Sequence, residues 1–236
     1  MSEVQNALDD IFDLSKTLFE QQADLYGDDI FIDRNIFSSK HSFQAQAPET
    51  FDSFREKVLE CTQCQLCKTR RNVVFGDGNP KTQILLVGEA PGQEEDIQGK
   101  PFVGAAGQLL DKILAAIQLN RQKVFIVNVL KCRPPQNRDP QPDEISQCVP
   151  YLWKQIEFIQ PKIILAMGRF AGQVLLGTES SLSQMRGKVH QKGNFKIIVT
   201  YHPAALLRHA EWKRPTWEDV KLLRRTYDEL SGNPTK

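Results

Sequence analysis

QILLVGEA, at residues 83–90, contains a short apolar run that is followed by a glycine, Gly88, a pattern typical of a buried strand. Three runs of the same kind follow it along the chain: VFIVNVL at 124–130, KIILAMG at 162–168 and KIIVTYH at 196–202. Each is apolar on both alternating faces, which is characteristic of strands buried inside a parallel sheet. The sequence therefore predicts four parallel strands.

Helical patterns separate the first three of these strands and follow the last one. They lie at 105–119, 143–159 and 216–230, and the capping-box pair Thr216 and Asp219 is predicted to open the third. Strands that alternate with helices predict an α/β fold, a three-layer sandwich with a central four-stranded parallel sheet flanked by helices.

The segment before residue 50 differs in composition from the rest of the 236-residue chain. Residues 38–50 have the composition of a linker, so we expect an acidic extension at 1–50, partly helical or flexible, and one domain at 51–236. Apolar residues at helical spacing predict a short amphipathic helix between Leu8 and Phe19. The chain has neither an 18-residue apolar stretch nor a basic leader, which predicts a cytoplasmic protein without a membrane partner.

The formal net charge of +1 hides a strong asymmetry. Residues 1–50 carry ten acidic and three basic side chains, whereas residues 51–236 carry 27 basic and 19 acidic ones. Between residues 186 and 214 only Glu211 opposes a set of seven cations: Arg186, Lys188, Lys192, Lys196, Arg208, Lys213 and Arg214. Such a stretch suits a polyanion, although charge alone fits a solvated mixed surface equally well.

Five cysteines, an odd number, make a disulfide framework improbable in a cytosolic chain and favour metal binding or catalysis. Cys61 and Cys64 form a C-x2-C pair, and CTQCQLC, which includes Cys67, also resembles the start of a ferredoxin-like run. Cys132 and Cys148 lie at the two ends of a proline-rich segment. Four thiolates suit a zinc ion and an iron–sulfur cluster equally well, so residue types alone leave both open.

Ligands of such sheets bind at the carboxyl ends of the strands, and here those ends carry distinctive residues. The first strand leads into GEAPG, the second contains Asn128, and the fourth ends in His202 and Pro203. The chain contains no GxxxxGK[ST] motif and GEAPG lacks the spacing of GxGxxG, so neither a dinucleotide nor a nucleotide cofactor is predicted.

Four separated motifs resemble, in order and in spacing, those of the family 4 uracil-DNA glycosylases, the members of their superfamily that contain an iron–sulfur cluster. They are CTQC, GEAPGQEEDIQGKPFVGAAGQLL, VNVLKCRPPQNRDPQPDEISQC and YHPAALLR, and the resemblance covers residues 55 to about 230. It implies a DNA repair enzyme, a hydrolase that flips deoxyuridine out of DNA and releases uracil. An iron–sulfur protein that binds nucleic acid or transfers electrons, without glycosylase activity, is the alternative.

The resemblance implies a uracil pocket formed by Gly88, Glu89, Ala90, Phe102, Asn128 and His202. Phe102 would stack on the base, and its glycine-punctuated loop argues against burial in the core. The Asn128 amide, both donor and acceptor, fits the O4 and N3–H edge of uracil and mismatches cytosine. His202 would donate a hydrogen bond to uracil O2 as negative charge develops there.

The group that activates the attacking water stays open. Ala90 stands where another branch of the superfamily has a water-activating aspartate, so Glu89 is the nearest catalytic candidate. Three further acidic residues follow it in the same segment, Glu94, Glu95 and Asp96.

The segment after His202 is implied to bind DNA through Pro203, Ala204, Leu206, Leu207 and Arg208. Leu206 or Leu207 would enter the minor groove as a wedge, unless AALL begins a helix. The family more often has serine where this chain has Ala204, which removes one phosphate contact. Arg133 and Arg138 are further candidates for phosphate binding.

The family pattern assigns a structural [4Fe-4S] cluster to Cys61, Cys64, Cys132 and Cys148, and leaves Cys67 spare. Zinc remains the alternative metal. The expected partner is uracil-containing DNA, bound by a monomer without a nucleotide cofactor.

Overall fold

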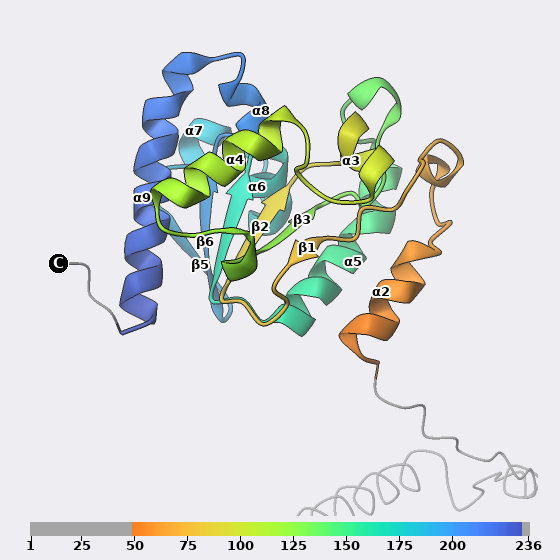
Figure 1. Cartoon of the computed structure of the whole chain (residues 1–236), viewed down its shortest axis with the longest axis horizontal. Helices are drawn as coiled ribbons and strands as arrows, with labels where there is room; N and C mark the ends of the chain where they lie inside the picture. The colour runs from red at the N-terminus through yellow and green to blue at the C-terminus, as the bar shows by residue number, and fades with distance from the viewer. Residues whose placement is uncertain (1–48, 233–236) are drawn as a thin grey trace, which may run out of the picture. The chain divides into compact units, whose positions relative to one another are not determined.

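The computed structural model describes residues 49–232, so the predicted helix between Leu8 and Phe19 lies outside the described residues. The described part contains a six-stranded sheet with the order β1-β3-β2-β4-β6-β5 (Figure 1). Its four central strands are parallel, as predicted: β2 (Ile84–Gly88), β3 (Phe125–Asn128), β4 (Ile163–Met167) and β6 (Phe195–Thr200).

The prediction of four strands was incomplete, because an antiparallel strand lies at each edge of the sheet. β1 (Asp77–Gly78) pairs with β3, and β5 (Val189–Lys192) pairs with β6. β1 is only two residues long, and every residue of β5 is exposed or half-buried. Neither segment therefore contains the apolar run by which the central strands were recognised.

Successive residues of the central strands point to opposite faces of the sheet and build two separate cores. On one face, Leu85 and Val87 belong to a core that includes residues of α2 (Phe51–Leu59), α5 (Pro142–Ile159) and α6 (Arg169–Leu176). On the other face, Ile84 and Leu86 pack with residues of α4 (Ala105–Ala116) and α9 (Lys213–Leu230). Helices on both faces confirm the predicted three-layer α/β sandwich (Figure 1).

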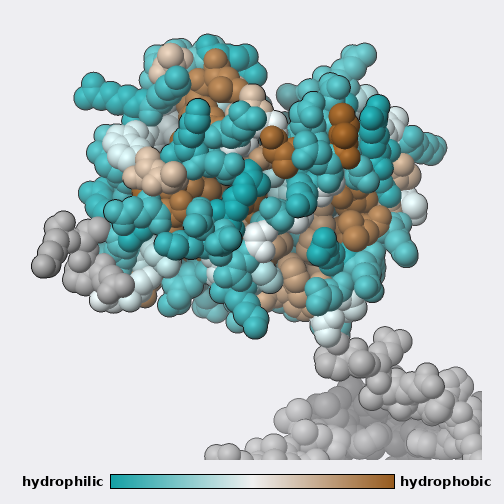
Figure 2. Space-filling model, in the orientation of Figure 1, coloured by the Kyte–Doolittle hydropathy of each residue, from teal (hydrophilic) through white to brown (hydrophobic). Residues whose placement is uncertain are grey.

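Short helices connect these layers: α3 (Gln93–Gln98), α7 (Leu182–Met185) and α8 (Pro203–Leu206), with 3-10 turns η2 (Gln65–Lys68), η3 (Arg121–Lys123), η4 (Pro135–Asn137) and η5 (Ala210–Trp212). The surface in the view of Figure 2 is mostly hydrophilic, with hydrophobic residues in separate patches. Among helices in the described part of the chain, none combines the length and the apolar character that a membrane span requires.

The predicted capping box of Thr216 and Asp219 is wrong, because α9 begins at Lys213 and contains both residues. The Thr216 hydroxyl donates to the carbonyl of Trp212 at 2.8 Å. The Asp219 carboxylate instead accepts hydrogen bonds from Arg186 and from the hydroxyl of Thr200, 2.8 Å away. Asp219 therefore joins α9 to β6 and to Arg186.

Candidate active site

A cavity of about 420 Å³ opens at the carboxyl ends of β2, β3 and β6. Its wall combines the loop after β2, the end of β3, the proline-rich segment before α5 and the start of α8. The lining residues are Glu89, Ala90, Pro91, Gly92, Glu95, Phe102, Ala106, Asn128, Pro134, Asn137, Arg138, Asp139, His202, Ala204, Ala205 and Arg208. Five of the six residues predicted to bind uracil line the cavity, and Gly88 lies directly behind it.

Asn128 occupies the last position of β3 and has only 1% of its surface exposed. Its Oδ1 atom is buried and has no hydrogen-bond partner. An unsatisfied buried acceptor costs about 1–3 kcal/mol, so folded proteins seldom keep one without a reason. Because Asn128 lines the cavity, a ligand that donates a hydrogen bond would supply the missing partner.

Phe102 is 5% exposed, so the expectation that its loop argues against burial was wrong. The ring packs in the core and against the imidazole of His202, with ring centroids 5.3 Å apart and an interplanar angle of 32°. Gly88 makes this packing possible, because a Cβ atom there would collide with Asn128 Oδ1 and with the Phe102 ring. Phe102 is thus a core residue that also lines the cavity.

The loop that carries Phe102 is held in an unusual backbone conformation, with a φ of 54° at Phe102 itself. Glu95 Oε1 accepts hydrogen bonds from the backbone N–H groups of Val103 and Gly104, at 2.8 and 2.9 Å. From the other side, the Arg121 guanidinium donates to the carbonyls of Pro101 and Phe102. Glu95 and Arg121 therefore hold the loop in place, a role that the sequence pattern did not indicate.

Two of the candidate acids are explained by these structural contacts. Glu95 holds the Phe102 loop, and Asp96 accepts from the backbone N–H groups of Arg71 and Asn72 at 2.9 and 3.4 Å. Asp96 is 3% exposed and does not line the cavity. Glu94 does not line it either.

His202 lies after β6 and is the N-cap residue of α8. Its Nδ1 atom accepts a hydrogen bond from the backbone N–H of Ala204 at 3.2 Å. Burial lowers the pKa of His202 from 6.5 to about 4, with a smaller opposing effect of Glu95 and a smaller lowering effect of Arg208. The imidazole is therefore neutral at pH 7, and because Nδ1 accepts, its proton is on Nε2.

Glu89 follows β2 and lines both this cavity and a neighbouring one of about 330 Å³. Burial raises the pKa of Glu89, the negative charge of Asp139 raises it further, and Arg169 opposes both. Asp139 and Arg169 line the neighbouring cavity and were not identified from the sequence. A carboxylate with a raised pKa beside a ligand cavity is a candidate proton acceptor.

The segment after His202 forms the short helix α8, which is the alternative that the sequence left open for AALL. The two leucines of this segment differ sharply: Leu206 is 2% exposed and Leu207 is 53% exposed. Leu206 belongs to the protein interior, so the structure corrects its assignment as a DNA wedge. Pro203 is also buried, whereas Ala204 and Arg208 line the cavity.

Several of the cations expected to face DNA have protein partners. Arg138 forms an ion pair with the buried carboxylate of Glu144, with bonds of 2.6 and 2.9 Å. Arg133 donates to the Asn137 side chain at 2.8 Å. Arg186 is bound to Asp219. These three arginines therefore have partners within the protein, and of them only Arg138 lines the cavity.

A second, apolar cavity contains the four cysteines of the predicted cluster site: Cys61, Cys64, Cys132 and Cys148. Cys67 does not line it, and its thiol instead lies 3.9 Å from the carbonyl of Thr62. All five cysteines are free thiols. Within residues 49–232, no three His, Cys, Asp or Glu side chains are grouped so that they could hold a single metal ion.

Hydrogen-bond donors, one of them cationic, face two of these sulfur atoms. Arg70 Nη1 lies 3.3 Å from Cys132 Sγ, and the backbone N–H of Lys131 donates to Cys148 Sγ at 3.2 Å. Burial raises the pKa of Cys132 to about 11 against the opposing effect of Arg70, and burial lowers the pKa of Lys131 to about 8. Donors and positive charge around buried sulfurs suit thiolate ligands.

The described residues thus form a three-layer α/β sandwich with a ligand cavity at the ends of β2, β3 and β6. The model of the uracil DNA glycosylase superfamily matches residues 75–221, which is more than half of the chain, and the chain belongs to this superfamily.

Within the superfamily, the chain is similar to proteins named type-4 uracil-DNA glycosylase. It is 44% identical to that of Archaeoglobus fulgidus over 181 residues, which are 73% of this chain and 91% of the relative. The protein of Sulfurisphaera tokodaii is 45% identical over 197 residues, 80% of this chain and 88% of the relative. The protein of Thermotoga maritima is 44% identical over 177 residues, which are 73% of this chain and 92% of the relative.

Proposed function

We propose that this member of the uracil DNA glycosylase superfamily hydrolyses the N-glycosidic bond of deoxyuridine in DNA, releases uracil and leaves an abasic site. The single observation that carries the proposal is the buried, unpartnered Oδ1 atom of Asn128, a residue that lines the cavity together with Phe102 and His202. A base whose edge donates one hydrogen bond and accepts another completes this group.

Base recognition rests on Asn128 and Phe102. Uracil presents N3–H to Asn128 Oδ1 and O4 to the amide nitrogen, whereas cytosine has an acceptor at N3 and an amino donor at the neighbouring position. A cytosine would therefore leave the buried oxygen unpaired, and such losses discriminate strongly between substrates. Phe102 supports the base by stacking, and its loop is fixed by Glu95 and Arg121.

His202 acts on the leaving group. The neutral imidazole donates Nε2–H to uracil O2, where negative charge accumulates as the bond between C1′ and N1 breaks. A donor placed at such a position lowers the barrier by roughly 3 kcal/mol. The Ala204 N–H fixes the imidazole orientation that this donation requires.

Glu89 takes the proton of the attacking water, in this proposal, after the bond to uracil has largely broken. Its raised pKa makes it a better base than an exposed carboxylate. The oxygen of the water then bonds to C1′, and the proton passes to the carboxylate. Replacement of Glu89 by glutamine keeps the shape and removes the base.

DNA is bound along the segment that follows His202. Leu207, which is 53% exposed, is the residue that can enter the gap left by the flipped nucleotide. Arg208 lies at the cavity rim and supplies positive charge for a phosphate. Leu206 is buried and anchors this segment to the protein interior.

Four thiolates, from Cys61, Cys64, Cys132 and Cys148, are proposed to hold a [4Fe-4S] cluster. These cysteines line one cavity, with Arg70 and Lys131 available to offset their negative charge. Each iron of a cluster takes one cysteine, so the sulfurs need wider separation than four ligands of one zinc ion. When bound, the cluster ties the segment around Cys61 to α5 and to the end of β3.

Excision of uracil from a synthetic oligonucleotide is the decisive experiment. The protein is incubated, without added metal or nucleotide, with single- and double-stranded oligonucleotides that contain one deoxyuridine, and abasic sites are cleaved with alkali. Strand scission at uracil, its absence with cytosine, and a large loss in Glu89→Gln and His202→Ala are expected. Intact strands after incubation with folded wild-type protein would overturn the proposal.

We further propose that the protein is a cytoplasmic monomer and that the extension predicted at residues 1–50 ends at residue 48, because Glu49 pairs with Lys57 and Lys154 and Thr50 caps α2. Residues 1–48 carry nine acidic residues against three basic ones, so they would compete with DNA for the basic domain. Removal of residues 1–48 should then tighten DNA binding, and size-exclusion chromatography with light scattering should give the mass of one chain.

A further inference from the structure

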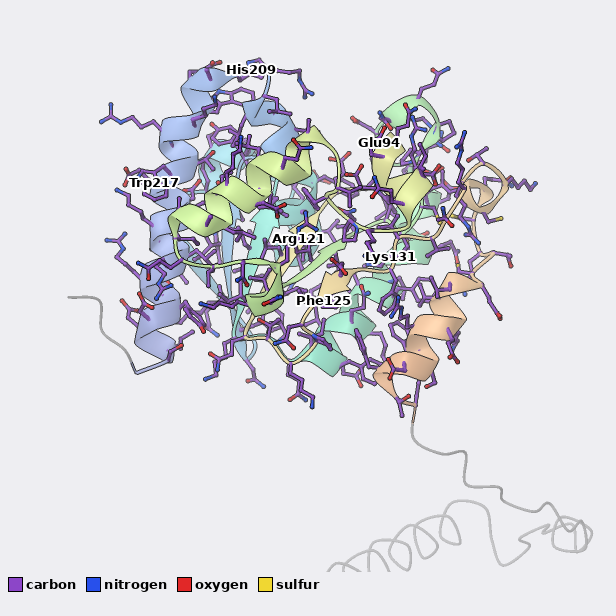
Figure 3. The ribbon with its side chains drawn as sticks, in the orientation of Figure 1. Glu94, Arg121, Phe125, Lys131, His209 and Trp217 are labelled. Carbon is purple, nitrogen blue, oxygen red and sulfur yellow. The ribbon has the colours of Figure 1, made fainter. Side chains whose placement is uncertain are left out.

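Lys131 is the one lysine that is buried among residues 49–232, with 2% of its surface exposed. It lies three residues after Asn128 and directly before Cys132, between the cavity at the strand ends and the cysteine cavity. Figure 3 shows it in the interior, beside α5. A buried ammonium group is costly, so its contacts indicate what it does.

The Lys131 ammonium makes two short hydrogen bonds and no ion pair with a carboxylate in the described part of the chain. Nζ donates to the backbone carbonyl of Asn128 and to Gln155 Oε1, both at 2.6 Å. Gln155 is 0% exposed and its amide donates to the carbonyl of Phe75 at 2.8 Å, so its orientation is fixed. The ammonium thus connects the end of β3 to α5.

The same residue also contacts the cysteine cavity. Its backbone N–H donates to Cys148 Sγ at 3.2 Å, and its carbonyl accepts from the Val74 N–H at 2.7 Å. Lys131 itself lines this cavity. Lys131 is a buried cation without a carboxylate partner in the described part of the chain, and it lines this cavity together with four cysteines, which fits a cavity that holds thiolate charge.

We infer that Lys131 is a positioning residue for uracil recognition: its ammonium fixes the Asn128 end of β3 and links that position to the loaded cysteine site. This inference rests on the proposed function, because it assigns Asn128 to the base. Asn128 Oδ1 has no protein partner to orient it, so the backbone must place it. The Nζ contact to the Asn128 carbonyl is a side-chain contact that fixes this backbone.

The test compares Lys131→Met with Lys154→Met, a matched control on the surface of α5 whose side chain is 35% exposed. Methionine keeps the length and apolar stem of lysine and removes both Nζ hydrogen bonds. We expect the rate of single-turnover excision to fall about tenfold to a hundredfold in Lys131→Met, because the two buried acceptors of Nζ lose their donor. The rate of Lys154→Met should stay near that of wild type. Lys131→Arg, which retains a donor cation, should recover part of the loss.

A double-mutant cycle separates positioning from general damage. If Lys131 acts through Asn128, Lys131→Met should cost little further activity in an Asn128→Ala background. A purely structural defect would reduce excision by the same factor in both backgrounds. Affinity for an oligonucleotide with an uncleavable 2′-fluoro-deoxyuridine provides a readout independent of turnover, and it should weaken in Lys131→Met but not in Lys154→Met.

Absorbance near ~400 nm and iron content report whether each variant carries the cluster. If Lys131→Met does not fold or load, Gln155→Met replaces it, because Gln155 holds Nζ without contacting a cysteine, and it should show a smaller loss that also disappears with Asn128→Ala. Full activity of a loaded Lys131→Met protein, or additive losses in the cycle, would overturn the inference. Inactive wild-type protein would instead overturn the proposed function.

Discussion

The backbone N–H of Ala204 donates a hydrogen bond to Nδ1 of His202 at 3.2 Å. A nitrogen that accepts cannot carry the proton in the neutral ring, so the proton lies on Nε2. Because burial lowers the pKa of His202 to about 4, this neutral form persists through the physiological range. The function of His202 as a donor therefore does not depend on protonation of the imidazole.

The first prediction is that the rate of uracil excision shows no fall attributable to His202 between pH 6 and 8, around its ordinary pKa of 6.5. A cationic donor would instead lose activity as pH rises through that range. Single-turnover rates of wild type and His202→Asn should differ by a constant factor of about a hundred across the range. A difference that vanishes above pH 7 would contradict the neutral donor.

The free energy of unfolding should decrease at acidic pH because of His202. The folded-state pKa of His202 lies below its ordinary value, so the unfolded chain binds more protons between about pH 4 and 6.5. The contribution of His202 to the free energy of unfolding is therefore complete above pH 6.5 and is lost as pH falls toward 4. Denaturation of His202→Asn should show a weaker dependence on pH in this window.

Replacement of Asn128 by alanine should lower activity strongly while it leaves stability nearly unchanged. The variant removes a buried acceptor that has no partner, so its free energy of unfolding should stay within about 1 kcal/mol of wild type. Excision should nevertheless fall by about a hundredfold or more, because the base edge loses its partner. Chemical denaturation and single-turnover kinetics measure the two effects.

Val127→Ala is the matched control, since Val127 precedes Asn128 on the same strand and is 0% exposed. That variant should lose about 2 kcal/mol of stability and retain excision. If Asn128→Ala proved as destabilising as Val127→Ala, the Asn128 amide would have a structural role that its contacts do not indicate.

The central sheet could be predicted because strands such as Ile84–Gly88 are buried at every position and contain no polar side chain. The edge strands could not, since β5 is half exposed and β1 contains only Asp77 and Gly78. Sequence pattern also placed Asp219 in a capping box, although its partners Arg186 and Thr200 come from distant parts of the chain. A local sequence pattern cannot predict contacts between residues that lie far apart in the chain.

The residues of the candidate site also divide into those that the sequence could assign and those that it could not. Asn128 and His202 could be placed at strand ends from pattern and resemblance, and the structure brings both to one cavity. Which of two adjacent leucines is exposed depends on how α8 packs, which the residues AALL do not specify. The functions of Glu95 and Lys131 depend on the backbone groups that their side chains reach, so no residue pattern could have assigned them.

Leu206, the last residue of α8, and Leu207, which follows it, provide a matched pair of variants. Leu206→Ala should lower the free energy of unfolding by about 2–5 kcal/mol, because Leu206 is buried. Leu207→Ala should change stability by less than about 0.5 kcal/mol, because this side chain is exposed. Excision from double-stranded DNA should fall roughly tenfold in Leu207→Ala, with a smaller loss on single strands, where no gap must be filled. Equal losses on both substrates would refute the wedge.

Cysteine variants should divide into two groups. Cys67→Ala should keep the absorbance near ~400 nm and the iron content of wild type, because Cys67 lies outside the cysteine cavity. Cys148→Ala removes a lining thiol that also accepts from the Lys131 N–H, so it should lose the absorbance and much of the stability. Stoichiometric zinc without iron in the wild type would refute the cluster, and loss of iron in Cys67→Ala would refute the assignment of ligands.

Ala204→Ser should strengthen DNA binding. Ala204 lines the cavity two residues after His202, and a serine hydroxyl there can donate to a phosphate oxygen without adding charge. We expect uracil-containing oligonucleotides to bind about threefold to tenfold more tightly, which is the range for one ordinary hydrogen bond that remains accessible to water. Fluorescence anisotropy against salt concentration distinguishes this effect from a gain in charge. The slope of log affinity against log salt should be unchanged in Ala204→Ser, whereas Arg208→Ala should reduce it by about one, because a cation is lost. Affinity no higher than that of wild type in Ala204→Ser would show that no phosphate passes within reach of residue 204.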